Sequence, residues 1–465
     1  FAAFFAVDHW LFAQNGFLRA FGQATQEGQV QSKVQRAQRL AEVADIIMVG
    51  SSYVRSGVAG EPFLEAGLLP FNFAVSGGGP VYDYFALRRI EPILRRRRAK
   101  PTVLLELKTD ALVRTKGSVW SEYPQYSGIV RDRREMLAHF QPLWRNFSDF
   151  GMTSQLLSGL VVPSSIYRSY TVPMLGAGIR NDTFFYGMED FSGFSPLLTR
   201  ALPAMVPTVT LELPNVGIEG IYRGKLDFLQ RFLSLASSIG VRVVLYESPS
   251  LLMGRDHKVL EGLVAKLTAQ FSGLSVIRSS DYSLSVEDFD EGGHPNIRGS
   301  DKMARHLISR LNLAGSKAEL ERKLHAAFDR APIPDTSLWR TAGGRVAAGG
   351  NRLLIGGAAP ADALIAESPA IPVSPGREWV LEVAMPSVRG RLSVTLNSES
   401  AAGVRQGLEF ISPTESPLFG DSNRMFLRAT PGTSAMTIKV FDYEVQNGRV
   451  ASTGDVRFLR LWTVR

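Results

Sequence analysis

Short apolar runs alternate with stretches of helical periodicity along the first two thirds of the chain. Four apolar residues, Ile46 to Val49, run directly into Gly50-Ser51-Ser52, which is typical of a buried parallel strand that ends in a sharp turn. Similar strands are predicted at residues 69–75, 102–107, 241–246 and 274–277. Strands that alternate with helices at this spacing predict an α/β domain, in which helices cover both faces of a parallel sheet.

Amphipathic helices are expected between these strands. Apolar residues recur at helical spacing in residues 31–43, 80–98, 217–238, 257–271 and 300–311. We expect residues 1–43 to form a helical N-terminal segment and residues 44–325 to form the α/β domain. Residues 115–215 show no clear period, and we interpret them as an insertion with helices around 131–160 and long loops after them.

The pattern changes after about residue 330. Short segments with β-branched residues recur between Gly, Pro, Asn and Ser, which predicts an antiparallel β-sandwich or jelly roll over residues 330–465. Residues 374–383 resemble the strand entry of carbohydrate-binding jelly rolls. This resemblance implies that the C-terminal domain binds glycan, although small β-sandwiches have many other uses.

A serine pair, Ser51 and Ser52, follows the first predicted strand. Binding sites in open α/β sheets lie outside the carboxyl ends of the strands, so a serine here is a nucleophile candidate. The same Gly-Ser-Ser sequence is also an ordinary start of a helix, in which serine accepts hydrogen bonds from the first free N–H groups. Both interpretations apply when the tripeptide is taken alone.

A loop near residue 290 supplies a candidate base. It reads Asp288-Phe-Asp-Glu-Gly-Gly-His294-Pro-Asn and places several acids just before a histidine. A serine hydroxyl needs a base within hydrogen-bond reach to act as a nucleophile at neutral pH. Among the six histidines, only His294 lies in a glycine-rich loop with acids just upstream. We therefore expect His294 to be the base, with a carboxylate to orient it.

These segments together resemble a known family. Gly50-Ser51-Ser52 resembles the Gly-Asp-Ser block of SGNH (GDSL-like) hydrolases, with Ser51 in the slot usually held by Asp, and Glu291-Gly-Gly-His294 resembles their closing Asp-x-x-His block. Asn72-Phe-Ala-Val-Ser-Gly-Gly-Gly79 resembles their second block, which contributes to the oxyanion hole. The resemblance spans about residues 44–312. It implies a flavodoxin-type sheet, Ser52 as nucleophile and His294 as base.

The orienting acid and part of the oxyanion hole stay open. The family spacing favours Glu291 as the acid, and residue type favours Asp290, whereas Asp288 is more distant. The backbone N–H groups of Ser52 and of Gly77 or Gly78 are expected to face the developing oxyanion. The asparagine of the family's third block is absent from Lys108-Thr109-Asp110. Thr109 or Asp110 could replace it, but a carboxylate facing an oxyanion would repel it.

Composition excludes several classes of site. The chain has no cysteine, which excludes disulfides and thiolate metal sites and fits an oxidising compartment. No pair of histidines has the spacing of metal ligands, and Gly77-Gly-Gly lacks the lysine of a phosphate loop, so we expect no metal and no cofactor. The net charge of +8 favours an acidic partner. The basic cluster at residues 95–100 is interpreted as a solvated helix end rather than a nucleic-acid site.

The apolar opening FAAFFAVDHWLF is shorter than a membrane span, and we expect it to be either the remnant of a membrane anchor or an amphipathic helix. An SGNH-like domain followed by a β-sandwich resembles the alginate O-acetyltransferase group. This resemblance implies a periplasmic O-acetyltransferase, tethered to the inner membrane, that acts on an anionic polysaccharide with an acetyl donor supplied by a membrane protein. A carbohydrate acetylesterase with the same triad and a non-catalytic polysaccharide-binding or assembly protein are the alternatives.

Overall fold

The structure is a computed structural model. It describes residues 6–7, 26–108, 112, 223–249, 257–290, 293–341, 346–356, 364–375, 377–389, 392–399, 405–411, 424–429, 434–442 and 452–464. The described residues fall into two compact units, one up to Lys323 and the other from Leu324 onward. The insertion predicted at 115–215 and most of the first 25 residues lie outside the described residues.

The first unit contains a parallel sheet. Its described strands are β1 (Ile46–Val49), β2 (Pro70–Asn72), β3 (Thr102–Leu107), β4 (Arg242–Glu247) and β5 (Ser275–Ile277). They lie in the order β2-β1-β3-β4-β5, and all neighbours pair in parallel. The prediction of an α/β domain with a parallel sheet is therefore confirmed. The order is that of flavodoxin-like sheets, and its direction reverses at β1, so the switch point lies between the carboxyl ends of β1 and β3.

The predicted strand at 69–75 is shorter than expected. Strand β2 ends at Asn72, although Phe73 N still donates to Met48 O and Val75 N to Gly50 O. The side chain of Asn72 interrupts the strand, because its Nδ2 donates to Val54 O and its Oδ1 accepts from Ala74 N. The chain after Asn72 therefore stays beside the end of β1 without forming a regular strand.

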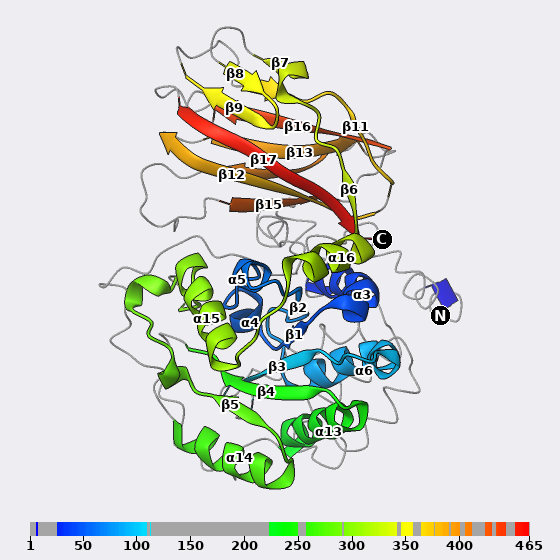
Figure 1. Cartoon of the computed structure of the whole chain (residues 1–465), viewed down its shortest axis with the longest axis vertical. Helices are drawn as coiled ribbons and strands as arrows, with labels where there is room; N and C mark the ends of the chain where they lie inside the picture. The colour runs from blue at the N-terminus through cyan, green and yellow to red at the C-terminus, as the bar shows by residue number, and fades with distance from the viewer. Residues whose placement is uncertain are drawn as a thin grey trace. The chain divides into compact units, whose positions relative to one another are not determined.

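Helices cover the sheet on both faces. The described helices of this unit are α3 (Gln26–Val43), α4 (Ser52–Arg55), α5 (Glu61–Glu65), α6 (Pro80–Arg96), α13 (Arg223–Ile239), α14 (His257–Gln270) and α15 (Ile297–Arg310), and α16 (Lys317–Ala327) runs into the second unit. Helix α6 packs against α3 and α13, whereas α15 packs against α5 (Figure 1). Right-handed crossovers require these two groups to lie on opposite faces, because the strand order reverses at β1. No described helix is long and apolar enough to cross a membrane.

The second unit is a β-sandwich, as predicted. One antiparallel sheet has the order β14-β13-β16-β10-β7, with β11 also on β16, and the other has the order β15-β12-β17-β9-β8, with β6 also on β17. The described strands are β6 (Phe328–Ala331), β7 (Arg340–Thr341), β8 (Val346–Gly349), β9 (Arg352–Ile355), β10 (Leu364–Glu367), β11 (Ile371–Pro372), β12 (Trp379–Arg389), β13 (Leu392–Glu399), β14 (Arg405–Ile411), β15 (Arg424–Ala429), β16 (Ala435–Asp442) and β17 (Thr453–Val464).

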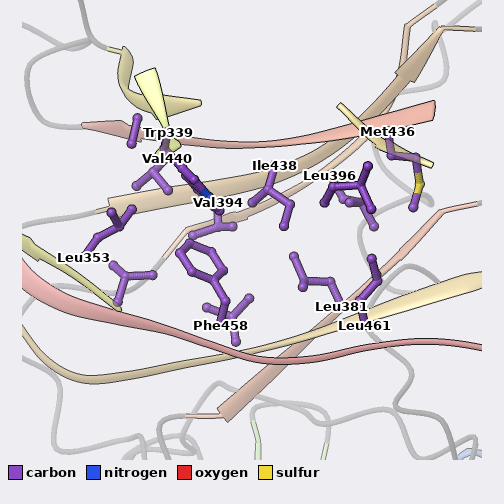
Figure 2. Packing of buried hydrophobic residues seen from close by; sticks show 14 of the residues in the cluster. Trp339, Leu353, Leu381, Val394, Leu396, Met436, Ile438, Val440, Phe458 and Leu461 are labelled. Carbon is purple, nitrogen blue, oxygen red and sulfur yellow. The ribbon is translucent and has the colours of Figure 1, made fainter. Parts of the chain in front are cut away.

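Alternating side chains build the core of the sandwich. Strand β16 alternates half-buried and buried residues along its whole length, as a strand with one face inward must. Figure 2 shows Leu353, Leu381 and Phe458 of one sheet pointing toward Val394 and Ile438 of the other. All five side chains are fully or almost fully buried, so this layer holds the two sheets together.

Candidate functional site

The turn after β1 places the serine pair at the switch point of the sheet. Gly50 has φ +148°, and a Cβ there would lie 2.5 Å from Val54 Cγ2 and 2.6 Å from Glu106 Cβ, so only glycine fits. Ser51 is the N-cap of α4, and its Oγ accepts a hydrogen bond from Tyr53 N at 3.3 Å. The helix-start interpretation therefore applies to Ser51, and the hydroxyl of Ser52 is left for another contact.

That contact is with His294. Ser52 Oγ lies 2.9 Å from His294 Nε2, although the two residues are 242 positions apart in the chain. The loop between the 3₁₀ turn Val286–Asp288 and α15 brings the histidine there. It closes on itself, since Asp290 N donates to His294 O at 2.8 Å and His294 N donates to Asp290 Oδ1 at 2.7 Å. The backbone of the histidine is thus fixed by the same residue that was a candidate acid.

The carboxylate of Asp290 also faces the far nitrogen of the imidazole. Asp290 Oδ1 lies 3.8 Å from His294 Nδ1, and both side chains are partly buried. Glu291, the other candidate acid, lies outside the described residues. Asp288 serves a different purpose: it is fully buried, and its carboxylate lies 2.8 Å from Lys302 Nζ and 3.0 Å from Arg298 Nε. Burial raises the pKa of Asp288, but hydrogen bonds from Lys302 and Ser285 outweigh it and hold the pKa below its usual value.

The glycine turn after β2 lies directly against the serine turn. A Cβ on Gly78 would lie 2.2 Å from Gly50 O, so this close approach of two backbones requires glycine. Gly78 N donates to Val75 O at 3.0 Å, which occupies one of the two glycine donors predicted for the oxyanion hole. Gly77, with φ +69°, is the remaining glycine candidate beside Ser52 N. Thr109 and Asp110 lie outside the described residues.

Glu106 is part of the site, but the sequence did not single it out. Its carboxylate accepts a hydrogen bond from Ser51 N at 2.6 Å through Oε2, and Ser248 Oγ donates to Oε1. Burial is the main influence on this carboxyl and raises its pKa, whereas Lys108 and the hydrogen bonds from Ser248 and Ser51 lower it. An acidic residue inside the apolar strand 102–107 was the available signal, because a buried charge needs partners.

A small pocket opens at the carboxyl end of β3. Its described lining consists of Gly78, Gly79, Pro80, Asp83, Glu106, Leu107, Lys108, Leu112 and Leu229. The walls are mostly apolar, and Glu106 links the pocket to the serine turn through Ser51 N. Within the described residues, no group of three or more His, Asp or Glu side chains is arranged to hold a metal ion.

Two other sequence interpretations concern surfaces. In the basic cluster, Arg97 donates to Ala41 O and Ala44 O, and Lys100 donates to Leu94 O and Arg95 O. These contacts cap helix ends, which favours the helix-end interpretation.

In the sandwich, the three tryptophans that the structure describes, Trp339, Trp379 and Trp462, are at most 5 % exposed. They pack in the sandwich and present no flat ring to a sugar.

Comparisons with known proteins give only distant similarities. No family model matches the chain, and no curated protein matches it. A two-domain esterase active on acetylated mannans is 8 % identical over 93 % of this chain and 94 % of its own, with a TM-score of 0.23. The CBM22-1 xylan-binding domain of Xyn10C from Paenibacillus barcinonensis is 12 % identical over 30 % of this chain and 93 % of its own, with a TM-score of 0.20.

A third similarity is to the CBM22-1 and GH10 modules of xylanase 10B from Clostridium thermocellum, which are 12 % identical over 29 % of this chain, with a TM-score of 0.18. The match covers 28 % of the solved chain that holds those modules. At TM-scores of 0.18 to 0.23, these similarities do not establish a common fold.

Proposed function

We propose that the first unit is a serine acyl-transfer centre that carries an acetyl group on Ser52 and passes it to a hydroxyl of an anionic polysaccharide. The observation that carries this proposal is the 2.9 Å contact between Ser52 Oγ and His294 Nε2 at the switch point of the sheet. A hydroxyl and an imidazole at this distance form the nucleophile and general base of acyl transfer.

Each step follows from these atoms. Ser52 Oγ attacks the acyl carbonyl while His294 Nε2 takes its proton, and we expect the N–H groups of Ser52 and Gly77 to stabilise the oxyanion. The bond to the donor's leaving group breaks, and the imidazolium returns the proton to that group. The acceptor hydroxyl then attacks the acetyl carbonyl and loses its proton to Nε2. The bond between the acetyl carbon and Ser52 Oγ breaks, and the imidazolium returns the proton to Oγ. Asp290, 3.8 Å from Nδ1, stabilises the imidazolium in both half-reactions.

The same proposal includes an acidic polysaccharide as the acceptor and a compartment outside the cytoplasm. A net charge of +8 attracts an acidic polymer, and the absence of cysteine suits an oxidising compartment outside the cytoplasm. A membrane protein that delivers the acetyl group is the partner we propose for the donor side. Acetyl ester hydrolysis is the second candidate, because the His294 side chain is 24 % exposed and water can reach the acyl-enzyme from that side.

The test is incubation with 4-nitrophenyl acetate, followed by mass spectrometry and by product analysis. We expect an adduct of one acetyl group on Ser52, a burst of nitrophenol, and loss of both in Ser52→Ala. Ser51→Ala is the matched control, since it keeps the N–H bound by Glu106 and loses only a helix cap, which costs about 0.5–2 kcal/mol of stability. It should still form the adduct.

The acceptor is then varied. An oligouronate that becomes acetylated faster than a neutral oligosaccharide of the same length supports the transferase, and release of acetate with neither sugar modified supports the esterase. An adduct that persists in Ser52→Ala would contradict the assigned nucleophile. A wild-type protein that forms no adduct and releases no nitrophenol would contradict the proposal and favour a non-catalytic polysaccharide-binding protein.

A further inference from the structure

An aromatic ring and a cation pack around the histidine of the proposed site. Tyr53, the residue after Ser52, stacks on His294 with ring centroids 4.1 Å apart and an interplanar angle of 22°. Lys108, directly after β3, places its Nζ 3.8 Å from the centroid of the same Tyr53 ring. Three elements that are distant in the sequence thus meet at one ring: α4, the loop before α15 and the end of β3.

The Tyr53 ring is well placed to fix the imidazole. Tyr53 is 5 % exposed, and its backbone N–H is held by the Ser51 cap at the start of α4. His294, by contrast, lies at a partly exposed position, where an unsupported side chain samples several rotamers. The contacts at Nε2 and Nδ1 define the edge of the imidazole, and the stacked ring defines its plane.

The charge of Lys108 acts on the same imidazole. The distance from Lys108 Nζ to the centre of the imidazole is at most the sum of the 3.8 Å to the Tyr53 centroid and the 4.1 Å between the two rings. This distance is shorter than the Debye length of about 10 Å at 0.1 M salt, so the charge is not fully screened. Among the described residues, neutral Ser52 and Tyr53 from α4 and the carboxylate of Asp290 from the loop also contact or face the imidazole. Lys108 also acts on the buried Glu106 of β3: burial raises the pKa of that carboxyl, and the charge of Lys108 lowers it by less.

We propose that Tyr53 and Lys108 are positioning residues for His294, in which the tyrosine ring holds the plane of the imidazole and the lysine charge opposes its protonation. Asp290 favours the imidazolium, and Lys108 disfavours it. The balance keeps the imidazole neutral, and therefore able to accept the serine proton, at lower pH than Asp290 alone would allow. This inference rests on the proposed function, because it concerns the base of that reaction.

The first test is the pH–rate profile of Lys108→Gln with 4-nitrophenyl acetate. We expect the acidic limb of kcat/KM to move to higher pH by about half a unit to one unit at low salt. The shift should shrink at 1 M salt, where the Debye length falls to about 3 Å, and Lys108→Arg should keep the wild-type profile. Lys266→Gln, at an exposed position on α14, is the control for an equal change in net charge. A Lys108→Gln profile equal to that of the wild type at low salt would overturn the electrostatic role.

The second test removes the ring. Tyr53→Phe keeps the stacked ring and should leave kcat within about twofold, whereas Tyr53→Leu should lower kcat at least about tenfold with little change in KM, because misplacement of a base costs transition-state stabilisation. Replacing Lys108 by Gln in the Tyr53→Leu background should shift the acidic limb less than it does in the wild type. Equal kcat values for the Leu and Phe variants would overturn the positioning role.

A third measurement does not depend on turnover. The imidazole of His294 can be titrated by NMR in histidine-labelled protein and assigned by the signal lost in His294→Asn. We expect its midpoint to rise in Lys108→Gln and to stay unchanged in Lys266→Gln. If the wild type shows no acyl transfer but this midpoint moves as expected, the proposed function fails and the electrostatic contact stands. If activity is present but the midpoint does not move, only the inference about Lys108 fails.

Discussion

Substitution of Asn296 can loosen the loop that carries His294 without changing a residue of the proposed triad. It is 1 % exposed and makes four side-chain hydrogen bonds. Its Oδ1 caps α15 by accepting from Arg298 N and Gly299 N, each at 3.1 Å, and its Nδ2 donates to Glu287 O at 2.9 Å and Phe289 O at 3.1 Å. One amide therefore ties the start of the helix to the loop that carries His294.

Three substitutions at this position separate the two halves of the amide. Asn296→Ser keeps a capping oxygen but loses the two donations, which leaves two buried carbonyls without this donor, and we expect a loss of about 2–4 kcal/mol. Asn296→Ala loses the cap as well, which adds about 0.5–2 kcal/mol. Asn296→Asp keeps the cap but points a second oxygen at two carbonyls, so it should be less stable than the serine variant at neutral pH.

Urea unfolding of the first unit, combined with hydrogen exchange over residues 286–310, measures these losses. Loosening of the loop that carries His294 should also lower kcat at least about tenfold in the Asn296→Ser variant, since displacement of a base by about 1 Å can lower the rate by about a hundredfold. A serine variant with wild-type exchange and wild-type kcat would refute the reasoning, because it would show that the two donations neither hold the loop nor place the imidazole.

Three further outcomes follow from the described contacts. Asp290→Asn should lower kcat by about 10²- to 10⁴-fold with 4-nitrophenyl acetate, because an amide cannot stabilise the imidazolium; an unchanged kcat would leave Glu291 as the acid. The pKa of Asp288 is lowered in the folded protein, so its contribution to stability is present above the unfolded value of about 3.9 and is lost as the pH falls through the folded value. Asp288→Asn should therefore be less stable at pH 7 and lose less stability on acidification, as measured by urea unfolding between pH 7 and 3. Leu353→Ala, at a fully buried position, should destabilise the sandwich by about 2–5 kcal/mol, whereas Leu354→Ala, next to it and 42 % exposed, should change its stability by less than about 1 kcal/mol.

The sequence predicted the elements of the first unit because local patterns determine them. Strand β3 has the predicted bounds, and α6 and α14 end within two residues of theirs. The end of β2 was missed since it depends on Asn72, whose side chain donates to Val54 O of α4 and accepts from Ala74 N. In the sandwich, alternation predicted strands but not their partners. The long pairing of β12 with β17 joins segments some 70 residues apart, and only the assembled core selects it.

The site was partly predictable because two of its segments have distinctive local sequences. Gly-Ser-Ser and the His294 loop stand out locally, and the topology of a parallel sheet brings the ends of its strands to one edge. The sequence could not assign Glu106 or Tyr53, because their importance lies in contacts between elements. A glutamate in a strand and a tyrosine after a serine have many ordinary uses, and only the distances to Ser51 N and to the imidazole distinguish these two.

Glu106 explains why serine, rather than aspartate, suits position 51 in this turn. The hydroxyl of Ser51 accepts from Tyr53 N, and the backbone N–H of Ser51 donates to Oε2 of the Glu106 carboxylate. An ionised aspartate at position 51 could cap the helix, but it would set a second carboxylate beside the buried carboxylate of Glu106, where like charges repel strongly. Serine at position 51 and glutamate at position 106 are therefore a matched pair. The carboxylate beside the nucleophile turn is supplied from β3, and Ser52 keeps its hydroxyl for the imidazole.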